Sequence, residues 1–171
     1  MAIVIRQNES DVKLAFDVHR HAEIVKIRLA SASMRAEDFR DTSEQNLQIR
    51  FAYESAHKPA QVGVLRIQVK FRMQGSVKQD SETSREKAKA AVKVECVFEA
   101  DYSLKPEFEI TPEHIRAFRE GNAIFNLWPY FREFLQSHVT AMALPPFVAP
   151  FLRIQPKLPA PAPEARSRKK S

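Results

Sequence analysis

The chain has 171 residues, a single cysteine, three glycines and a formal net charge of +6. That length predicts one domain able to bury a sizeable core without disulfides or metal. The single cysteine excludes an intrachain disulfide, and the scattered glycines exclude the glycine-rich loops that cradle nucleotide phosphates. No apolar run approaches the roughly 18 residues that span a bilayer, and the N-terminus does not resemble a secretory signal. We therefore expect a soluble cytoplasmic protein.

The N-terminal part of the chain predicts a short helix and then a strand. Apolar residues recur at helical spacing between Asp11 and Arg20, and from about Ile24 to Met34 they alternate with polar ones instead. A period near 3.6 is typical of a helix and a period of two is typical of a strand. The polar residues 35–46 predict a loop or a crossover.

Three further alternating segments follow. They cover residues 47–54, which residues 57–59 end, then residues 65–74 and residues 92–104. The charged residues 76–87 between the last two lack large apolar side chains and predict a mobile loop. Four amphipathic strands without helices between them predict an antiparallel sheet with one covered face and one face in water.

Basic side chains occupy outward positions of the first and third predicted strands. They are Lys26, Arg28, Arg66, Lys70 and Arg72. Such residues are typical of a solvated sheet face. The alternative is a nucleic-acid-binding or scaffold module, which would need a contiguous basic groove with exposed aromatic side chains.

Two helices are predicted after the sheet, which gives an α+β fold with a long C-terminal helix packed on one face. Thr111, with proline at the next position and an acid after it, begins a short helix that stops near Gly121. The longer helix runs from about Ala123 to Ala143. Pro129 within it predicts either a kink or the true start of the helix.

The long helix is apolar around most of its circumference. A helix of this kind is buried on several sides, and so small a domain offers nothing besides its own sheet to bury it. We therefore predict oligomerisation, with the helix between its own sheet and a partner subunit. The predicted oligomer interface consists of Leu127, Phe134, Leu135, Val139 and Met142.

The C-terminal part divides into an apolar segment and a basic tail. Residues 144–154 are strongly apolar, but three prolines predict that they form no regular strand. Residues 156–171 are rich in proline and alanine and then basic, which predicts a disordered tail. The folded domain is therefore expected to span residues 1–155.

No pattern indicates an enzyme, a cofactor or a metal site. The pair His19 and His21 could place two imidazoles on one face of a strand, but a surface pair at the end of an element is the simpler interpretation. Cys96 alternates with apolar neighbours, which is typical of a core residue rather than a nucleophile. The prediction is a chain without catalytic or metal-binding residues.

Two short motifs relate the chain to a known family. Residues 127–133 read Leu-Trp-Pro-Tyr-Phe-Arg-Glu, and residues 143–147 read Ala-Leu-Pro-Pro-Phe. These motifs resemble the signature of the SecB family of export chaperones, in which such a run opens the main helix. The Leu-Pro-Pro step is similar to that of the divergent SecB-like chaperones associated with toxin–antitoxin systems. The resemblance covers residues 20–154 in architecture and residues 127–147 in sequence.

The resemblance implies a homotetramer, a dimer of dimers in which the main helices lie between two sheets. It also implies that unfolded client proteins, export precursors or an antitoxin, bind by their exposed apolar segments in grooves beside the helix, without ATP or another cofactor. The client-binding residues are then Phe125, Trp128, Phe131, Leu144, Phe147, Val148, Phe151 and Leu152.

One departure from the family concerns its docking surface. Export members of the family bind the SecA motor through acidic residues on the exposed sheet face and have an acidic tail. The basic outward residues and the basic tail of this chain make SecA binding doubtful, but they leave client holding unaffected. Membrane insertion and nucleic-acid binding are not expected.

Overall fold

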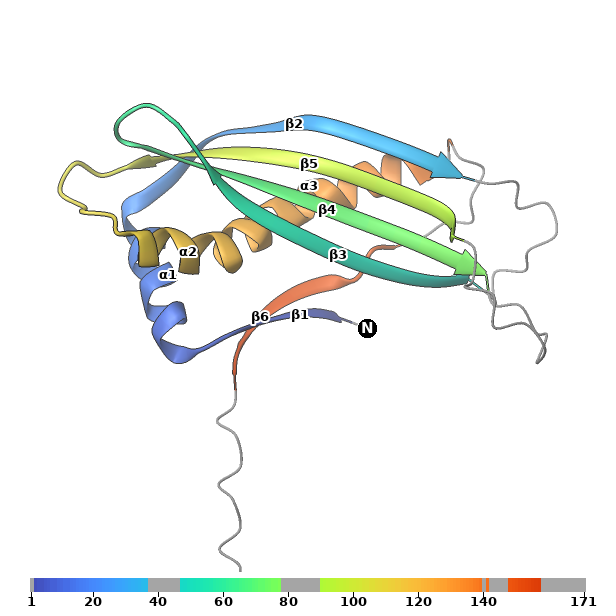
Figure 1. Ribbon diagram of the computed structural model, residues 1–171, viewed down its shortest axis with the longest axis horizontal. Helices are drawn as coiled ribbons and strands as arrows, with labels where there is room; N and C mark the ends of the chain where they lie inside the picture. Colours follow the sequence, from blue (N-terminus) through green and yellow to red (C-terminus); the bar gives the residue numbers. More distant parts are fainter. Residues whose placement is uncertain (1, 37–46, 78–89, 140, 142–147, 158–171) are drawn as a thin grey trace, which may run out of the picture.

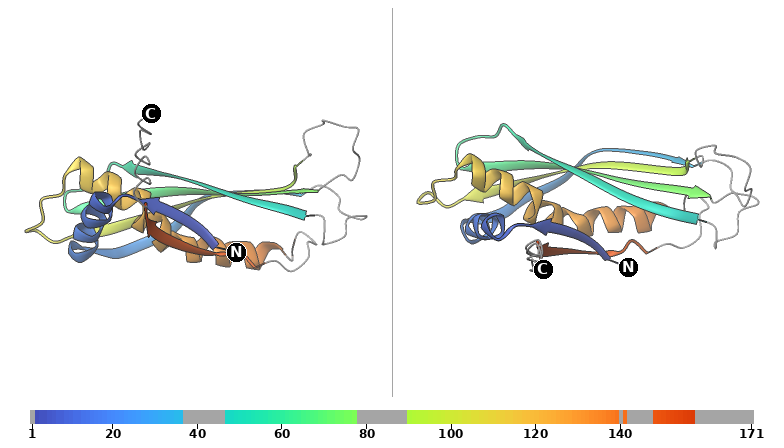
Figure 2. Two further views of the ribbon diagram at one scale, coloured as in Figure 1. Left: turned by 90° about the horizontal axis from the view of Figure 1, so that it is seen from below. Right: turned by 60° about the horizontal axis from the view of Figure 1, so that its bottom comes forward.

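The structure is a computed structural model that describes residues 2–36, 47–77, 90–139, 141 and 148–157. A four-stranded sheet forms one layer, and a long helix, α3 (Asn122–Val139), runs along one of its faces (Figure 1). A second sheet of two short strands, β1 (Ala2–Gln7) and β6 (Phe151–Pro156), lies on the same side as the helix (Figure 2). No helix in the described residues is long and apolar enough to cross a membrane.

The larger sheet confirms the predicted antiparallel arrangement. Its strands are β2 (Ala22–Ala36), β3 (Leu47–Lys58), β4 (Val64–Val77) and β5 (Ala90–Leu104), in the spatial order β2-β5-β4-β3. Every neighbouring pair is antiparallel. Together with the helices, this sheet gives the predicted α+β class. The predicted loop at residues 35–46 and the predicted mobile loop at residues 76–87 lie mostly outside the described residues.

Strands β4 and β5 form the centre of the sheet and follow the predicted alternation. Every second side chain is buried beneath α3, and the residues between them lie on the uncovered face. Three aromatic rings connect the sheet to the helix, because Phe71 stacks on Phe131 at 5.0 Å between ring centroids and meets Trp128 at 5.6 Å. The largest fully buried side chains include Tyr102, Phe71, Phe118, Phe131, Leu127 and Leu135.

Strand β2 departs from the simple alternation. Its register with β5 is irregular between Ile24 and Lys26 and again between Leu29 and Ser31, and each irregularity shifts the side chains from one face to the other. The first irregularity separates Val25, which is 60 % exposed, from Ile27, which packs against the core. Leu29 pairs with Phe98 on the same face as Ile27, yet it is exposed at the edge of the sheet. Strand β2 is an edge of the sheet, so these apolar side chains border a free edge within the described residues.

Helix α2 begins where its capping residue predicts, and the other two helices begin one or two residues before their predicted starts. Helix α1 (Glu9–His21) is capped by Asn8, whose side chain accepts the Asp11 N–H at 2.7 Å. Helix α2 (Pro112–Glu120) has Thr111 as its N-cap. Helix α3 begins at Asn122 with Pro129 inside it, so the alternative that Pro129 starts the helix is wrong. The helix is described as far as Val139, and the predicted end at Ala143 lies among residues 140 and 142–147, which are outside the described residues.

The pair formed by β1 and β6, here called the β1–β6 ribbon, was not predicted. The two strands are parallel, with Ala2 opposite Phe151 and Gln7 opposite Pro156. The prediction that prolines exclude a regular strand is therefore wrong for the end of the apolar segment. The prolines lie before strand β6 or at its last residue. Both strands of a two-stranded sheet are edge strands, so a missing backbone N–H is tolerated there. Strand β6 also includes Pro156, the first residue of the predicted tail; residues 158–171 lie outside the described residues.

The ribbon changes how the burial of α3 is explained. Ile5, Ala149 and Leu152 are buried in the same core as the helix. The premise that only a partner subunit can cover the second side of α3 is therefore wrong, because segments from both ends of the described chain contribute to that cover. Their contact depends on pairing residues about 150 positions apart in the sequence, which local periodicity does not reveal.

Candidate functional site

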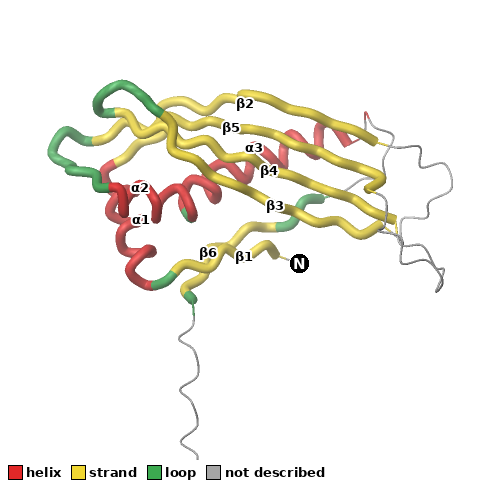
Figure 3. The backbone as a smooth tube through the Cα atoms, viewed as in Figure 1, coloured by secondary structure: helices red, strands yellow, loops and turns green. Residues whose placement is uncertain are grey.

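A groove opens between the edge of the larger sheet and the ribbon. Its lining comes from residues 2–3 of β1, residues 49–51 of β3, residues 148–151 and Arg132 of α3, and its volume is about 770 Å³. That volume lies within the range of about 300–1,000 Å³ typical of ligand sites. In the tube view, β3 is the strand of the larger sheet nearest to the ribbon (Figure 3). We call this the β3–ribbon groove.

Two large apolar side chains on the ribbon side of this groove are exposed. Val148 and Phe151 are each 68 % exposed, whereas Leu152, the next residue in β6, is buried. Successive side chains of a strand point to opposite faces, so β6 uses Leu152 to attach to the core and presents Phe151 to solvent. Exposed apolar side chains gathered in one groove are typical of a surface that binds another molecule.

Trp128 attaches the segment before β6 to α3. The indole Nε1–H donates a hydrogen bond of 3.0 Å to the Pro150 carbonyl. The indole is only 3 % exposed and meets the Phe51 ring edge-on at 5.6 Å between centroids. Trp128 therefore connects residue 150 on one side of the groove to β3 on the other.

Arg132 lies one turn further along α3 and is half-buried. Its Cζ is 4.9 Å from the centroid of the Phe151 ring, a distance typical of a cation–π contact. Its Nε atom is buried and has no hydrogen-bond partner among the described residues. The groove thus combines apolar side chains with one incompletely bonded guanidinium.

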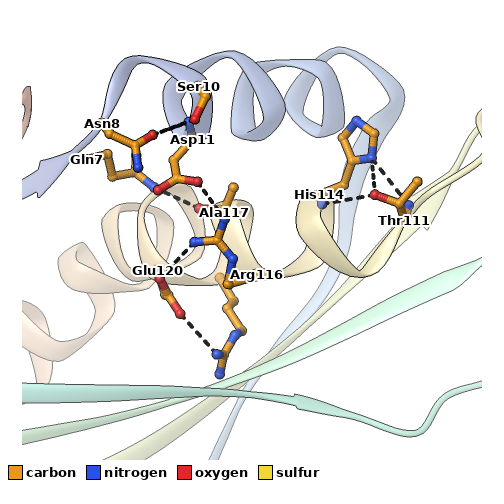
Figure 4. Close-up of polar contacts among 10 residues, drawn as sticks. Gln7, Asn8, Ser10, Asp11, Thr111, His114, Arg116, Ala117 and Glu120 are labelled. Carbon is orange, nitrogen blue, oxygen red and sulfur yellow. Dashed lines mark hydrogen bonds and ion pairs between the residues drawn. The ribbon is translucent and has the colours of Figure 1, made fainter.

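The other end of β1 is held by polar contacts with α2 (Figure 4). The Gln7 amide donates to the Ala117 carbonyl at 2.8 Å, and both groups are buried. Nearby, the Arg116 guanidinium donates to Asp11 at 2.7 Å, which joins α2 to α1. These contacts position the ribbon relative to the helices and thereby determine where one wall of the groove lies.

The predicted client-binding residues occupy three kinds of position. Phe125, Val148 and Phe151 are exposed, with Phe125 at 48 %. Trp128, Phe131 and Leu152 are buried, so binding a client through them would require the covering segment to move. Leu144 and Phe147 lie outside the described residues.

The predicted oligomer-interface residues are buried within the single chain. Leu127, Phe134, Leu135 and Val139 all belong to the buried residues beneath the sheet or at the end of α3, and Met142 lies outside the described residues. They have little surface to offer a second subunit in this conformation. The exposed apolar residues that sequence reasoning did not assign to an interface include Ile24, Val25 and Leu29 of β2, Val12 and Phe16 of α1, and Tyr130 of α3.

Several groove residues were missed by the sequence reasoning. The β-branched run Ile3-Val4-Ile5 is typical of a strand, but no strand was predicted there. Arg132 lies within the motif of residues 127–133, but it was not predicted to be a binding residue. Ile49 and Phe51 were expected to face the core. They do pack against it, but they also line the groove because β3 is an edge strand.

The uncovered face of the sheet carries more bases than acids, but several of its bases are paired with acids. Arg66 binds Asp101 through two hydrogen bonds of 2.6 and 2.8 Å, and Lys70 lies 2.8 Å from a carboxylate oxygen of Glu95. Arg72 contacts both Glu95 and Glu54, and Arg28 contacts Glu99.

The acids of this face come mainly from outward positions of β5, which the expectation of a basic face did not take into account. The hydrogen bond from Arg66 and its charge hold the pKa of Asp101 below its ordinary value, although partial burial opposes this effect. Pairing of this kind neutralises part of the positive charge on that face and thereby weakens the case for nucleic-acid binding.

The described residues contain no cluster of three or more side chains able to hold a metal ion. His19 and His21 lie in the last turn of α1 rather than on a strand, and His21 stacks on Phe108 at 4.6 Å between ring centroids. Cys96 is buried in β5, and this burial raises the pKa of its thiol to about 12. A thiol with so high a pKa is a poor nucleophile.

No protein-family sequence model matches the chain, and no curated protein matches it by sequence. Its class is defined by the fold: an α+β protein with a four-stranded antiparallel sheet and a long C-terminal helix on one face. More specifically, this is the fold of a SecB-like chaperone, and the resemblance predicted from residues 127–147 is confirmed.

One solved structure with this fold is a SecB-like chaperone from Mycobacterium tuberculosis in complex with a peptide from an antitoxin. It superposes with a TM-score of 0.70 over 84 % of this chain and 99 % of its own, at 18 % sequence identity. A protein of unknown function from Streptococcus agalactiae matches with a TM-score of 0.39 at 10 % identity, over 76 % of this chain and 97 % of its own. That second likeness is too weak to carry an argument.

Proposed function

We propose that this chain is an ATP-independent chaperone that holds unfolded proteins, and that the β3–ribbon groove binds their apolar segments. The observation that carries the proposal is the pair of exposed apolar side chains, Val148 and Phe151, in a groove of about 770 Å³ on a SecB-like fold. The gain in free energy on binding comes from removing apolar surface from water. Such binding needs no nucleotide and no catalytic group.

An antitoxin is the client that we propose first. The Mycobacterium protein with the same fold was solved with an antitoxin peptide bound, and the Leu-Pro-Pro step of residues 144–146 resembles the toxin–antitoxin branch of the family. Export precursors are the second client class. We place the protein in the cytoplasm, where both kinds of client are synthesised and a single reduced cysteine is expected.

The groove proposal is tested by truncating its exposed side chains. Phe151→Ala and Val148→Ala should leave thermal unfolding nearly unchanged, because exposed side chains contribute little to the core. Both variants should lose suppression of aggregation of a chemically denatured model protein. Phe16→Ala is the matched control, since Phe16 is 55 % exposed on α1 and does not line the groove. Unchanged suppression in both groove variants, or equal loss in the control, would contradict the assignment.

We further propose that the chain assembles as a homotetramer, a dimer of dimers. Two observations support this assembly. Strand β2 is 15 residues long, lies at an edge of the sheet and exposes Val25, Ile24 and Leu29, and such edges favour pairing with another strand. Phe125 and Tyr130 of α3 are also exposed, which leaves apolar helix surface for a second contact.

Sedimentation equilibrium at micromolar concentration tests the assembly. The wild-type chain should have about four times its mass of 19.6 kDa. Val25→Asp should dissociate the assembly without unfolding the chain, because Val25 is exposed in the single subunit and the new charge would be buried only at the interface. A monomeric wild type, or a Val25→Asp variant that remains tetrameric, would contradict assembly through β2.

A further inference from the structure

Arg132 is a cation within an apolar groove and lacks a full set of acceptors. Its Nε is buried without a hydrogen-bond partner among the described residues, and its guanidinium packs over the Phe151 ring. An arginine side chain carries five N–H donors and no acceptor. A buried donor without an acceptor is unfavourable. An anion bound at this guanidinium would supply an acceptor that the described residues do not.

The lining of the groove contains no acid. Its charged side chain is that of Arg132, which forms no hydrogen bond or ion pair within the described residues. Arg50 lies between Ile49 and Phe51 opposite Gln74, so its side chain is directed to the uncovered face of the sheet. Glu133, the next residue along α3, is exposed and accepts a hydrogen bond from Ser137 at 2.7 Å. The carboxylates of β5 are bonded to bases on the opposite, uncovered face of the sheet. The groove is therefore both apolar and positively charged.

We propose that the β3–ribbon groove selects unfolded segments in which an aspartate or glutamate stands beside large apolar residues, and that Arg132 binds the carboxylate. This inference rests on the proposed holding function and specifies its client class. The planar guanidinium matches the two oxygens of a carboxylate, while Phe151 and Val148 contact the apolar neighbours. Segments rich in lysine or arginine are disfavoured, because Arg132 repels them.

Three labelled peptides test this selectivity. They share one sequence rich in phenylalanine and leucine and differ only at a central position, which is Glu, Gln or Lys. Fluorescence anisotropy at low salt with the full chain measures their dissociation constants. We expect the Glu peptide to bind about tenfold more tightly than the Gln peptide, as one charge-assisted hydrogen bond implies. The Lys peptide should bind more weakly than the Gln peptide.

Two variants and one control connect this selectivity to Arg132. Arg132→Gln should bring the Glu and Gln peptides to within about twofold of each other, and Arg132→Lys should retain part of the preference, because it keeps the charge without the planar fork. Arg153→Gln removes an exposed base of β6 that does not line the groove, and it should leave the preference unchanged. Circular dichroism of each variant confirms that it is folded.

The outcomes separate the inference from the function on which it rests. If the wild-type chain binds all three peptides equally, the selection of acids is wrong while holding stands. If the preference for Glu persists in a folded Arg132→Gln variant, the assignment to Arg132 is wrong. If no peptide binds and aggregation is not suppressed, the holding function itself is wrong.

Discussion

Gly121 and Gln7 allow a test of how the β1–β6 ribbon is held against the helices. Gly121 is buried at the end of α2 with φ −128°, a backbone angle that any residue can adopt. A Cβ atom at this position would lie only 2.6 Å from the Cδ of Gln7. Gly121→Ala must therefore displace the Gln7 amide and break its 2.8 Å hydrogen bond to the Ala117 carbonyl.

The cost of Gly121→Ala follows from these contacts. An unpaired buried carbonyl costs about 1–3 kcal/mol, and forcing an extra methyl group into a packed site costs about 1–3 kcal/mol. We expect the free energy of unfolding to fall by about 2–4 kcal/mol. In a Gln7→Ala background the obstacle is absent, so the same substitution should lower the free energy of unfolding much less. The predicted coupling between the two sites is about 3 kcal/mol.

Urea unfolding followed by far-UV circular dichroism measures this double-mutant cycle. All four proteins are compared at one protomer concentration, because assembly would make the apparent stability depend on concentration. If the two substitutions are additive within about 0.5 kcal/mol, Gly121 and Gln7 do not meet, and the placement of the ribbon on α2 is wrong.

Three further outcomes are expected. Because Arg66 lowers the pKa of Asp101, the pair stabilises the folded chain above the unfolded-state pKa of about 4, and this stabilisation is lost as pH falls through the folded-state pKa. Asp101→Asn should therefore reduce the fall in the free energy of unfolding at acid pH, measured by urea unfolding. An unchanged pH dependence would contradict the pairing. The Cys96 thiol, with a pKa of about 12, should react with a thiol reagent at pH 8 far more slowly in the native chain than in urea, whereas equal rates would show that β5 is accessible. Leu127→Asp should abolish the native circular dichroism spectrum. Leu127 is fully buried, and burying an unpaired charge costs several kcal/mol. A folded variant would show that α3 does not pack as described.

More of the fold than of the groove could be predicted from the sequence. The alternation in residues 65–74 predicted β4, and the capping residue Thr111 predicted the start of α2. Both features are local, so their causes lie within a few neighbouring residues. The motif in residues 127–133 identified the fold through a family resemblance rather than through any physical property of the groove. Phe151 was named as a client-binding residue, and the structure exposes it in the groove on a strand that was not foreseen; its role in binding stays a prediction.

The sequence by itself determined the strands of the larger sheet, the two C-terminal helices and the apolar character of α3, because each depends on periodicity along one segment. Only the tertiary structure decided what covers α3 and which of its apolar residues face solvent. The pairing of β1 with β6 and the matching of β5 acids with bases on β2 and β4 join residues far apart in the chain. Such pairings depend on register and on edge position rather than on local pattern. They match several bases of the predicted basic face with acids, and they turn a predicted irregular segment into one wall of a groove.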